Sequence, residues 1–355
     1  MRAIDASFMT FVFKDGPPRW VSTTSNKVFP MPTTFGGRVA YSLDLLTSMR
    51  GPSWFSDRRW DFTPSTIISQ QARLSRTSRW RFVGTQLNWL ILYRILADIV
   101  DTGVKLIDFD PASMYPVSRD LPVYQQILCS IGIGLWIHLA IAAEHTLMSL
   151  IHVGFLGVSK PESWPPMFDH PFLCSSVPDF WGKRWHYMFR RTFDRLLAPL
   201  LPAPPKKTSH KEGNHPTTPD NTVKGQQSAT LARAGGAFVL TTMLHLIVIH
   251  RIVPSPTHPY AAFWDPSVML FFLAQPLGMA LDGILCSRLQ ASGVGKSGVA
   301  IARRAFAVGW LLWTARWWAD AWVRKGLWYK TERFIQWSPV RGLLWGDWFA
   351  QEAFR

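Results

Sequence analysis

The sequence has few acidic residues and few cysteines. Its 355 residues include 23 Asp and Glu against 38 Lys and Arg, which gives a formal net charge of +15, and it contains three cysteines. Cys129, Cys174 and Cys286 form neither a CxxC motif nor a disulfide framework, so we expect these thiols to be buried and inert. The positive charge would suit a nucleic-acid-binding protein. However, the chain has no zinc-ligand spacing, no glycine-rich RNA-binding signature and no regularly spaced basic helix, so nucleic acid is not an expected partner.

Several enzyme motifs are also absent. The chain contains no Gly-x-Ser-x-Gly motif, no Walker-type phosphate loop and no dinucleotide fingerprint. These absences argue against the common nucleophilic hydrolases and against nucleotide-binding enzymes built on those motifs.

Charged residues make up only 17% of the chain, whereas it contains 19 Trp and 23 Phe. The mean hydropathy is nevertheless only +0.04. The two facts agree because apolar residues gather in blocks that very basic connectors separate. This pattern predicts a membrane protein whose connectors face anionic lipid, with the lipid bilayer as its partner, rather than a single soluble core.

Five apolar blocks are candidates for membrane helices, namely 87–109, 121–143, 234–250, 266–281 and 298–322. Block 121–143 has no charged residue and is long enough to cross the hydrocarbon, so it is the clearest span. The next apolar piece, 145–158, is too short to cross alone, and we expect it to extend the preceding helix or to lie along the interface. The predicted fold class is therefore all-α, a polytopic bundle of membrane helices.

Block 87–109 is interrupted by charged residues. Arg94 and Asp98 are four residues apart, as are Asp101 and Lys105, so each pair can share one helix face. The block is then either a span whose ions pair inside the bundle or an interfacial helix.

The connectors predict the topology. If the first two blocks both span, the basic regions 50–81 and 183–211 lie on the cytosolic side, and 254–264, which has no Lys or Arg, lies on the other. Region 288–304 is basic again and returns to the cytosol. The tail after residue 323 breaks this rule, because it holds five Lys or Arg up to Arg341 although it should be lumenal.

One short stretch concentrates aromatic, cationic and titratable side chains. Residues 179–186 read Asp-Phe-Trp-Gly-Lys-Arg-Trp-His. Aromatic rings with a polar edge prefer the membrane–water boundary, and cations beside them suit phosphate. The stretch is either a site that draws a phosphate-bearing donor from water or an interfacial belt that anchors helices to headgroups.

His245 is the sharpest single candidate for catalysis. It lies inside block 234–250, away from Arg233 and Arg251. An ionisable residue within the membrane is costly and usually faces a cavity or a partner. Burial favours the neutral imidazole that a general base needs. The alternative is a histidine that bonds to the backbone of a neighbouring helix.

Three further histidines follow a regular spacing. His138, His145 and His152 are seven residues apart and can share one helix face. A metal site on that face is conceivable, but no carboxylate pattern of a di-iron site accompanies it, so we expect no metal.

Residues 165–186, called the motif segment below, resemble a known family. Pro166-Met167-Phe168-Asp169, a spacer with Ser175 and Ser176, and then residues 179–186 resemble the signature of the wax synthase-like family of integral-membrane acyltransferases. That family is similar in logic to the membrane-bound O-acyltransferases. In the last eight residues, Lys183 in place of the family's first arginine is the one change.

Two other segments extend the resemblance. Arg50-Gly51-x-x-Trp54 resembles the Arg-Gly-x-Gly-Trp of fungal members, with Ser53 in place of a glycine. The stretch 238–245 resembles the helix that carries the family's proposed catalytic histidine. The resemblance implies a membrane acyltransferase domain over 50–330, after an N-terminal segment 1–49. Within it, residues 202–230 are rich in Pro, Lys, Thr, Gly and Asn and have little apolar content, which predicts a flexible polar loop. The tail 331–355 alternates cations with Trp and is expected to be interfacial.

The resemblance also implies roles for individual residues. Neutral His245 would take the hydroxyl proton of the acceptor, with His186 as the second catalytic residue. The expected acyl-CoA-binding residues are Asp179, Phe180, Trp181, Lys183, Arg184 and Trp185. Among them, the two cations would hold donor phosphates, the indoles would line the entry, and the carboxylate would orient His186 or Arg184.

The implied reaction transfers an acyl group, acetyl from acetyl-CoA in the favoured version, to a hydroxyl of a lipophilic terpenoid-type alcohol in the endoplasmic reticulum membrane. Acyl-CoA is then a co-substrate, and no cofactor is bound permanently. One alternative is a wax ester synthase that joins long-chain acyl-CoA to a fatty alcohol. Another is a non-catalytic membrane transporter or scaffold that uses the aromatic and basic stretch as an anchor.

Overall fold

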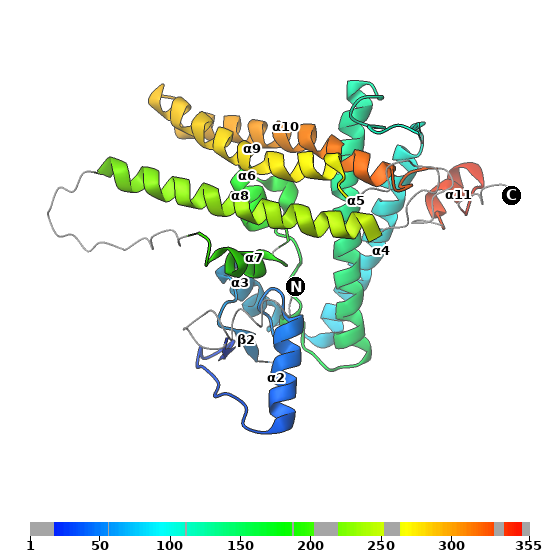
Figure 1. The fold of residues 1–355 in the computed structure, drawn as a ribbon. Helices are drawn as coiled ribbons and strands as arrows, with labels where there is room; N and C mark the ends of the chain where they lie inside the picture. Colours follow the sequence, from blue (N-terminus) through cyan, green and yellow to red (C-terminus); the bar gives the residue numbers. More distant parts are fainter. Residues whose placement is uncertain are drawn as a thin grey trace.

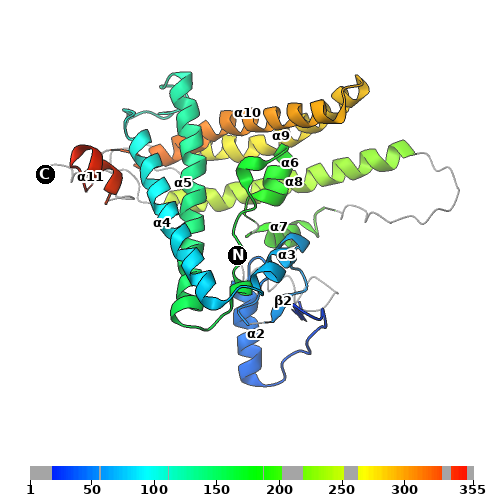
Figure 2. The same ribbon diagram turned by 180° about the vertical axis from the view of Figure 1, so that it is seen from behind.

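The computed structural model of the chain describes residues 18–55, 57–110, 112–186, 188–201, 219–251, 263–329 and 337–349. Over these residues the architecture is a helical bundle with one two-stranded sheet, which confirms the predicted all-α class. Two groups of long helices cross each other, and a smaller N-terminal unit lies on one side of their junction (Figure 1, Figure 2).

The first group is the pair α4 (Arg79–Val104) and α5 (Val123–Ser149). Helix α5 continues into a π-helical segment, η1 (Leu150–Phe155), so the apolar piece 145–158 extends the preceding helix. Arg79 at the start of α4 donates hydrogen bonds to the carbonyls of Val153 (2.8 Å) and Gly154 (2.7 Å). These bonds satisfy acceptors that the end of a helix leaves free, and they tie the two helices together.

The second group contains α8 (Pro219–Arg251), α9 (Pro266–Ala291) and α10 (Lys296–Val323). The carboxylate of Asp265 starts α9, because it accepts hydrogen bonds from the N–H groups of Ser267 (2.9 Å) and Val268 (3.2 Å). Helix α10 packs on both α9 and α5 and so joins the two groups.

Helix α8 corrects one prediction. The flexible loop predicted for 202–230 is helical from Pro219 onward, while residues 202–218 lie outside the described residues. The prediction rested on low apolar content, which argues against a buried face but does not exclude a helix. Proline at the first helical position is tolerated, and Gln226, Gln227 and Ala229 are good helix formers.

Among the described residues, three helices are long and apolar enough to cross a membrane: Val123–Phe155, Thr230–Arg251 and Pro266–Ala291. They contain the predicted blocks 234–250 and 266–281 and all but the first two residues of block 121–143. The other two blocks, 87–109 and 298–322, are also largely helical, as α4 and α10, but they carry more charge.

The charges of α4 pair inside the bundle, although not all in the predicted way. Asp101 bonds Lys105 as expected (2.8 Å) and also bonds Arg341 of the tail (2.9 Å). The expected pair of Arg94 and Asp98 does not form. Instead, Asp98 accepts a hydrogen bond from the backbone of Val340 (2.8 Å), and Arg94 donates to the carbonyl of Trp337. The tail helix α11 (Pro339–Trp345) thereby lies against α4 (Figure 1).

The N-terminal unit combines β1 (Trp20–Ser22), α2 (Phe35–Thr47), β2 (Arg58–Trp60) and α3 (Ser65–Leu74). Trp20 faces Trp60 in the antiparallel register. The buried carboxylate of Asp44 accepts hydrogen bonds from the indole of Trp20 (2.7 Å), the hydroxyl of Ser53 (2.8 Å) and the backbone N–H of Trp54 (2.8 Å). These contacts cross residue 50, so the expected domain boundary there is not a break in packing.

The main core lies where α5, α8, α9 and α10 meet. It includes Ile133, Leu246, Phe272 and Trp318. Cys129 and Cys174 are buried as expected, whereas Cys286 is half-buried.

Candidate active site

The motif segment and the residues just before it form four short elements between α5 and α8. They are η2 (Pro161–Ser163), η3 (Pro171–Leu173), α6 (Val177–Asp179) and the π-helical turn η4 (Phe180–Arg184), followed by helix α7 (Arg190–Leu197). The N–H of Asp169 donates to the carbonyl of Arg184 (3.0 Å), which closes the segment into a loop. Short π-helical turns are frequent at functional sites because they change which side chains share a face.

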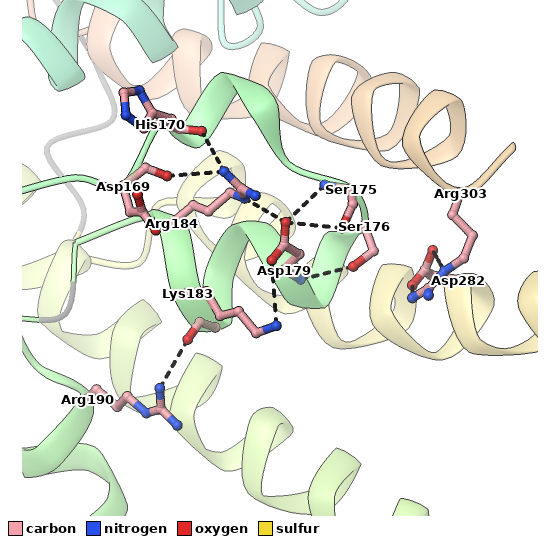
Figure 3. Close-up of polar contacts among 11 residues, drawn as sticks. Asp169, His170, Ser175, Ser176, Asp179, Lys183, Arg184, Arg190, Asp282 and Arg303 are labelled. Carbon is pink, nitrogen blue, oxygen red and sulfur yellow. Dashed lines mark hydrogen bonds and ion pairs between the residues drawn. The ribbon is translucent and has the colours of Figure 1, made fainter. Parts of the chain in front are cut away.

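Asp179 and Arg184 hold this loop together (Figure 3). The Arg184 Nε lies 2.6 Å from the Asp179 carboxylate, which also accepts bonds from the backbone and hydroxyl of Ser175 at 3.0 and 3.1 Å. Burial would raise the pKa of Asp179, but the donors on Ser175 and Arg184 outweigh it and lower that pKa. The bond to Asp179 raises the pKa of Arg184 in turn.

The guanidinium of Arg184 is used for structure. Besides Asp179, its Nη1 donates to the carbonyls of Asp169 (3.4 Å) and His170 (3.3 Å) (Figure 3). Lys183 differs, since its side chain is 72% exposed and its Nζ lies 3.9 Å from Asp179. Of the two cations expected to hold donor phosphates, Lys183 is therefore the one free to reach a ligand.

A cavity of about 770 Å³ lies on the other side of the loop. The loop contributes Phe180, Trp181, Trp185 and His186 to its wall, whereas Asp179, Lys183 and Arg184 do not line it. The turn η4 thus separates the predicted site residues into an aromatic face on the cavity and a charged face outside it. Helices α5, α7, α8, α9 and α10 supply most of the remaining lining, which is largely apolar.

His245 of α8 lines the same cavity. Its ring packs on Phe272 (4.3 Å between centroids) and meets Trp318 edge-on (5.4 Å). Its Nδ1 lies 2.8 Å from the carbonyl of Thr241. A carbonyl can only accept, so Nδ1 carries the proton and Nε2 keeps the lone pair that a general base needs. This bond lies within α8 and is not the bond to a neighbouring helix that the alternative interpretation of His245 predicts.

His186 is the second imidazole on the wall. Burial, with smaller contributions from His245 and Arg50, lowers its pKa to about 3, so the ring is neutral at physiological pH. Its Nδ1 has no hydrogen-bond partner among the described residues. The structure therefore brings the two predicted catalytic histidines to the wall of one cavity.

The Arg50-Gly51-x-x-Trp54 motif supports the loop from the N-terminal unit. Arg50 donates to the carbonyls of Pro165 (3.1 Å) and Pro166 (2.6 Å). Gly51 has φ of +108°, and a Cβ there would lie 2.8 Å from the Cα of Thr63, so only glycine fits. Sequence reasoning matched this motif to the family but did not predict that it clamps the signature loop.

The three regularly spaced histidines do share one face of the α5–η1 helix, as predicted. His138 packs on Phe168 (4.3 Å), while His145 and His152 pack on Trp164 (5.4 and 5.2 Å). This face is an aromatic bed for the motif segment. Within the described part of the chain, no group of three potential ligands is placed to hold a metal ion.

Comparison with known proteins agrees with this geometry. The model of the membrane bound O-acyl transferase family matches residues 164–274, which include the motif segment and His245. The O-mevalon transferase macI of Penicillium terrestre is 23% identical over 291 residues, which cover 78% of this chain and 61% of the relative. No solved structure matches the chain.

Two further relatives are named acetyltransferases. Acetyltransferase aurG of Calcarisporium arbuscula is 22% identical over 307 residues (79% of this chain, 65% of the relative). Acetyltransferase sirH of Emericella nidulans is 22% identical over 238 residues (64% and 47%). The chain thus spans about half to two thirds of the length of these three relatives. Its resemblance to membrane acyltransferases is confirmed, because residues 164–274 match the model of the membrane bound O-acyl transferase family.

Proposed function

We propose that the protein transfers an acyl group, acetyl from acetyl-CoA, to a hydroxyl of a lipophilic terpenoid-type alcohol in the endoplasmic reticulum membrane. One observation carries the proposal: His245 and His186 face a single apolar cavity from two different segments. The apolar and aromatic wall suits a large acceptor with few polar groups, since it offers few hydrogen-bonding partners.

The chemistry follows from the protonation of the two rings. Nε2 of His245 takes the proton of the acceptor hydroxyl while that oxygen attacks the thioester carbonyl. An N–H of neutral His186 donates a hydrogen bond to the oxyanion that forms there. The carbon–sulfur bond then breaks, and the proton on His245 passes to the departing thiolate. The products are an ester and free coenzyme A, and both histidines return to their starting state.

The donor binds where phosphate can meet a cation. Lys183 is exposed on the outer face of the motif loop, one turn from the cavity-lining aromatic residues. An ammonium at that position can hold the phosphates of acyl-CoA in water while the acyl group enters between the indoles.

The test is an assay of microsomes that contain the wild type or His245→Ala. Each preparation receives radiolabelled acetyl-CoA or palmitoyl-CoA with a panel of terpenoid and fatty alcohols. We expect acetyl transfer to fall by about 10²- to 10⁴-fold in the variant, the usual contribution of a general base. The matched control is His250→Ala, a histidine five residues further along α8 that does not line the cavity, and it should retain activity.

Other outcomes separate the alternatives. Transfer from palmitoyl-CoA but not from acetyl-CoA would favour the wax ester synthase. No transfer by a well-expressed wild type would contradict the proposal for these substrates and favour the transporter or scaffold.

A further inference from the structure

A buried polar network lies behind the cavity wall. Gln275 of α9 and Thr314 of α10 are both fully buried. The Oε1 of Gln275 accepts a hydrogen bond from the indole of Trp181 (3.1 Å). The Nε2 of Gln275 donates to the hydroxyl of Thr314 (3.1 Å) and to the carbonyl of Phe271 (2.7 Å). Three segments distant in sequence therefore meet at one amide.

The orientation of the Gln275 amide follows from its partners. An indole N–H can only donate and a carbonyl can only accept, so the amide oxygen must face Trp181 and the nitrogen must face Phe271. The hydroxyl of Thr314 donates a hydrogen bond to the carbonyl of Trp310 (2.8 Å). Every strong donor in this network has an acceptor, and such fully satisfied buried networks hold their members rigidly.

The network is connected to the candidate active site through aromatic rings. Gln275 does not line the cavity, but Trp181 does. The Trp181 indole meets Phe271 and Phe238 edge-on, at centroid distances of 6.1 and 5.4 Å. Phe271 in turn packs on Phe272, the ring that lies 4.3 Å from His245.

We propose that Gln275 is a positioning residue that fixes the Trp181 indole as the wall against which the acceptor alcohol rests. A rotated indole would change the shape of the cavity between His186 and His245. The kinetic test of this inference rests on the proposed function. The claim about the shape of the cavity is separate, and binding of the alcohol without acyl transfer can test it.

The experiment compares Gln275→Met, Trp181→Phe and the double variant with the wild type. Methionine keeps the volume of glutamine without its hydrogen bonds, and phenylalanine keeps a ring on the wall without the N–H. We expect each single variant to raise the KM for the acceptor about tenfold with a smaller change in kcat, the size of one lost hydrogen bond. Because Gln275 acts through Trp181, the double variant should lose little more than either single variant.

The matched control is Gln126→Met. Gln126 is a buried glutamine of α5 that bonds Arg316 (2.9 Å) and does not line the cavity. It should lower thermal stability as much as Gln275→Met does while leaving the KM unchanged. A conservative variant, Thr314→Ser, keeps the hydroxyl and should behave like the wild type, whereas Thr314→Val should resemble Gln275→Met.

A second measurement does not depend on acyl transfer. It is the rise in Tm that a saturating C15 isoprenoid alcohol produces when it binds the protein. We expect this shift to be smaller in Gln275→Met than in Gln126→Met. Additive losses in the double variant, or equal Tm shifts in the two glutamine variants, would overturn the inference. A wild type that binds the alcohol but transfers no acyl group would contradict the proposed function alone, and the Tm shifts would still decide the role of Gln275.

Discussion

At the scale of single residues, the candidate site depends on two imidazole rings, and the protein around each ring determines its protonation. The carbonyl of Thr241 fixes the tautomer of His245, and the protein around His186 keeps that ring neutral. Neither effect is visible in the residue type. The same imidazole on an exposed helix would be partly protonated near pH 6.5 and a poorer base.

This environment predicts an unusual pH dependence. The pKa of His186 is lowered to about 3 in the folded protein. Between about pH 6.5 and pH 3, His186 is therefore protonated in the unfolded chain but neutral in the folded protein. Stability should therefore fall as pH drops from 6.5 toward 3, by up to about 1.4 kcal/mol per pH unit from this group. The change can be followed as Tm in detergent at pH 7.0, 6.0 and 5.0.

The matched comparison is His186→Gln, which removes one of the buried histidines and should make the dependence shallower than in the wild type. Activity per folded wild-type molecule should show no loss centred at pH 6.5. An acid limb there, or equal pH slopes in the two proteins, would show that His186 is solvated and ordinary.

At the scale of elements, short motifs act by holding the loop that carries the site. Arg50 clamps the start of the loop through two carbonyls, and the pair of Asp179 and Arg184 closes its end. The π-helical turn η4 lies between these fixed points and directs the aromatic rings to the cavity. The order of residues 179–186 indicated that the stretch was special, but only its turn shows which side chains serve the cavity and which serve the loop.

Gly51 tests the role of the clamp. Its positive φ and the close approach of Thr63 predict that Gly51→Ala destabilises the protein by about 1–3 kcal/mol. The neighbouring residue Arg50 holds the loop through its hydrogen bonds. The specific activity should therefore fall by more than the loss of folded protein explains. Thermal unfolding and specific activity of the purified variant measure the two effects.

Gly84→Ala is the appropriate control. Gly84 lies within α4 and has open space around it. That substitution should be neutral or should stabilise the helix by about 0.5–1 kcal/mol. Equal destabilisation at both glycines would mean that neither conformation nor space decides the outcome.

At the scale of the whole molecule, ion pairs attach the segment after α10 to the helix bundle. Arg324 forms two bonds to Asp265 at 2.5 and 2.6 Å, and Arg341 bonds Asp101. Two of the five cations that broke the rule, Arg324 and Arg341, are thus paired with carboxylates of the helix bundle. The lumenal position of the tail stays a prediction.

The attachment of the tail to α4 makes a further prediction. Asp101 is buried between Lys105 and Arg341, so Asp101→Asn removes the buried carboxylate that both cations share and should cost about 3–5 kcal/mol. Asp347→Asn removes a carboxylate 3.8 Å from the same Arg341, but Asp347 is 38% exposed, so it should cost less than about 1 kcal/mol.

Thermal unfolding measures both variants, and limited proteolysis reports release of the tail. We expect earlier cleavage in Asp101→Asn alone. Similar Tm values for the two variants would argue that the tail is not held through Asp101.

The sequence by itself determined the class of the protein. Apolar blocks separated by basic connectors are what a bilayer requires, and they can be recognised in the sequence. The aromatic, cationic and titratable side chains of residues 179–186 are likewise adjacent in the chain. The shared face of His138, His145 and His152 also follows from helix periodicity alone. Local features of this kind can be read because neighbours in sequence create them.

Tertiary structure decided everything that joins distant segments. It placed His186 and His245 on one cavity, bonded Arg184 to Asp179 at the end of the loop, and paired the tail with α4 rather than Arg94 with Asp98. It also enclosed Gln275, a residue without any motif, beside Trp181. These contacts depend on how helices pack across more than a hundred residues of chain, and the spacing of residue types carries no record of that packing.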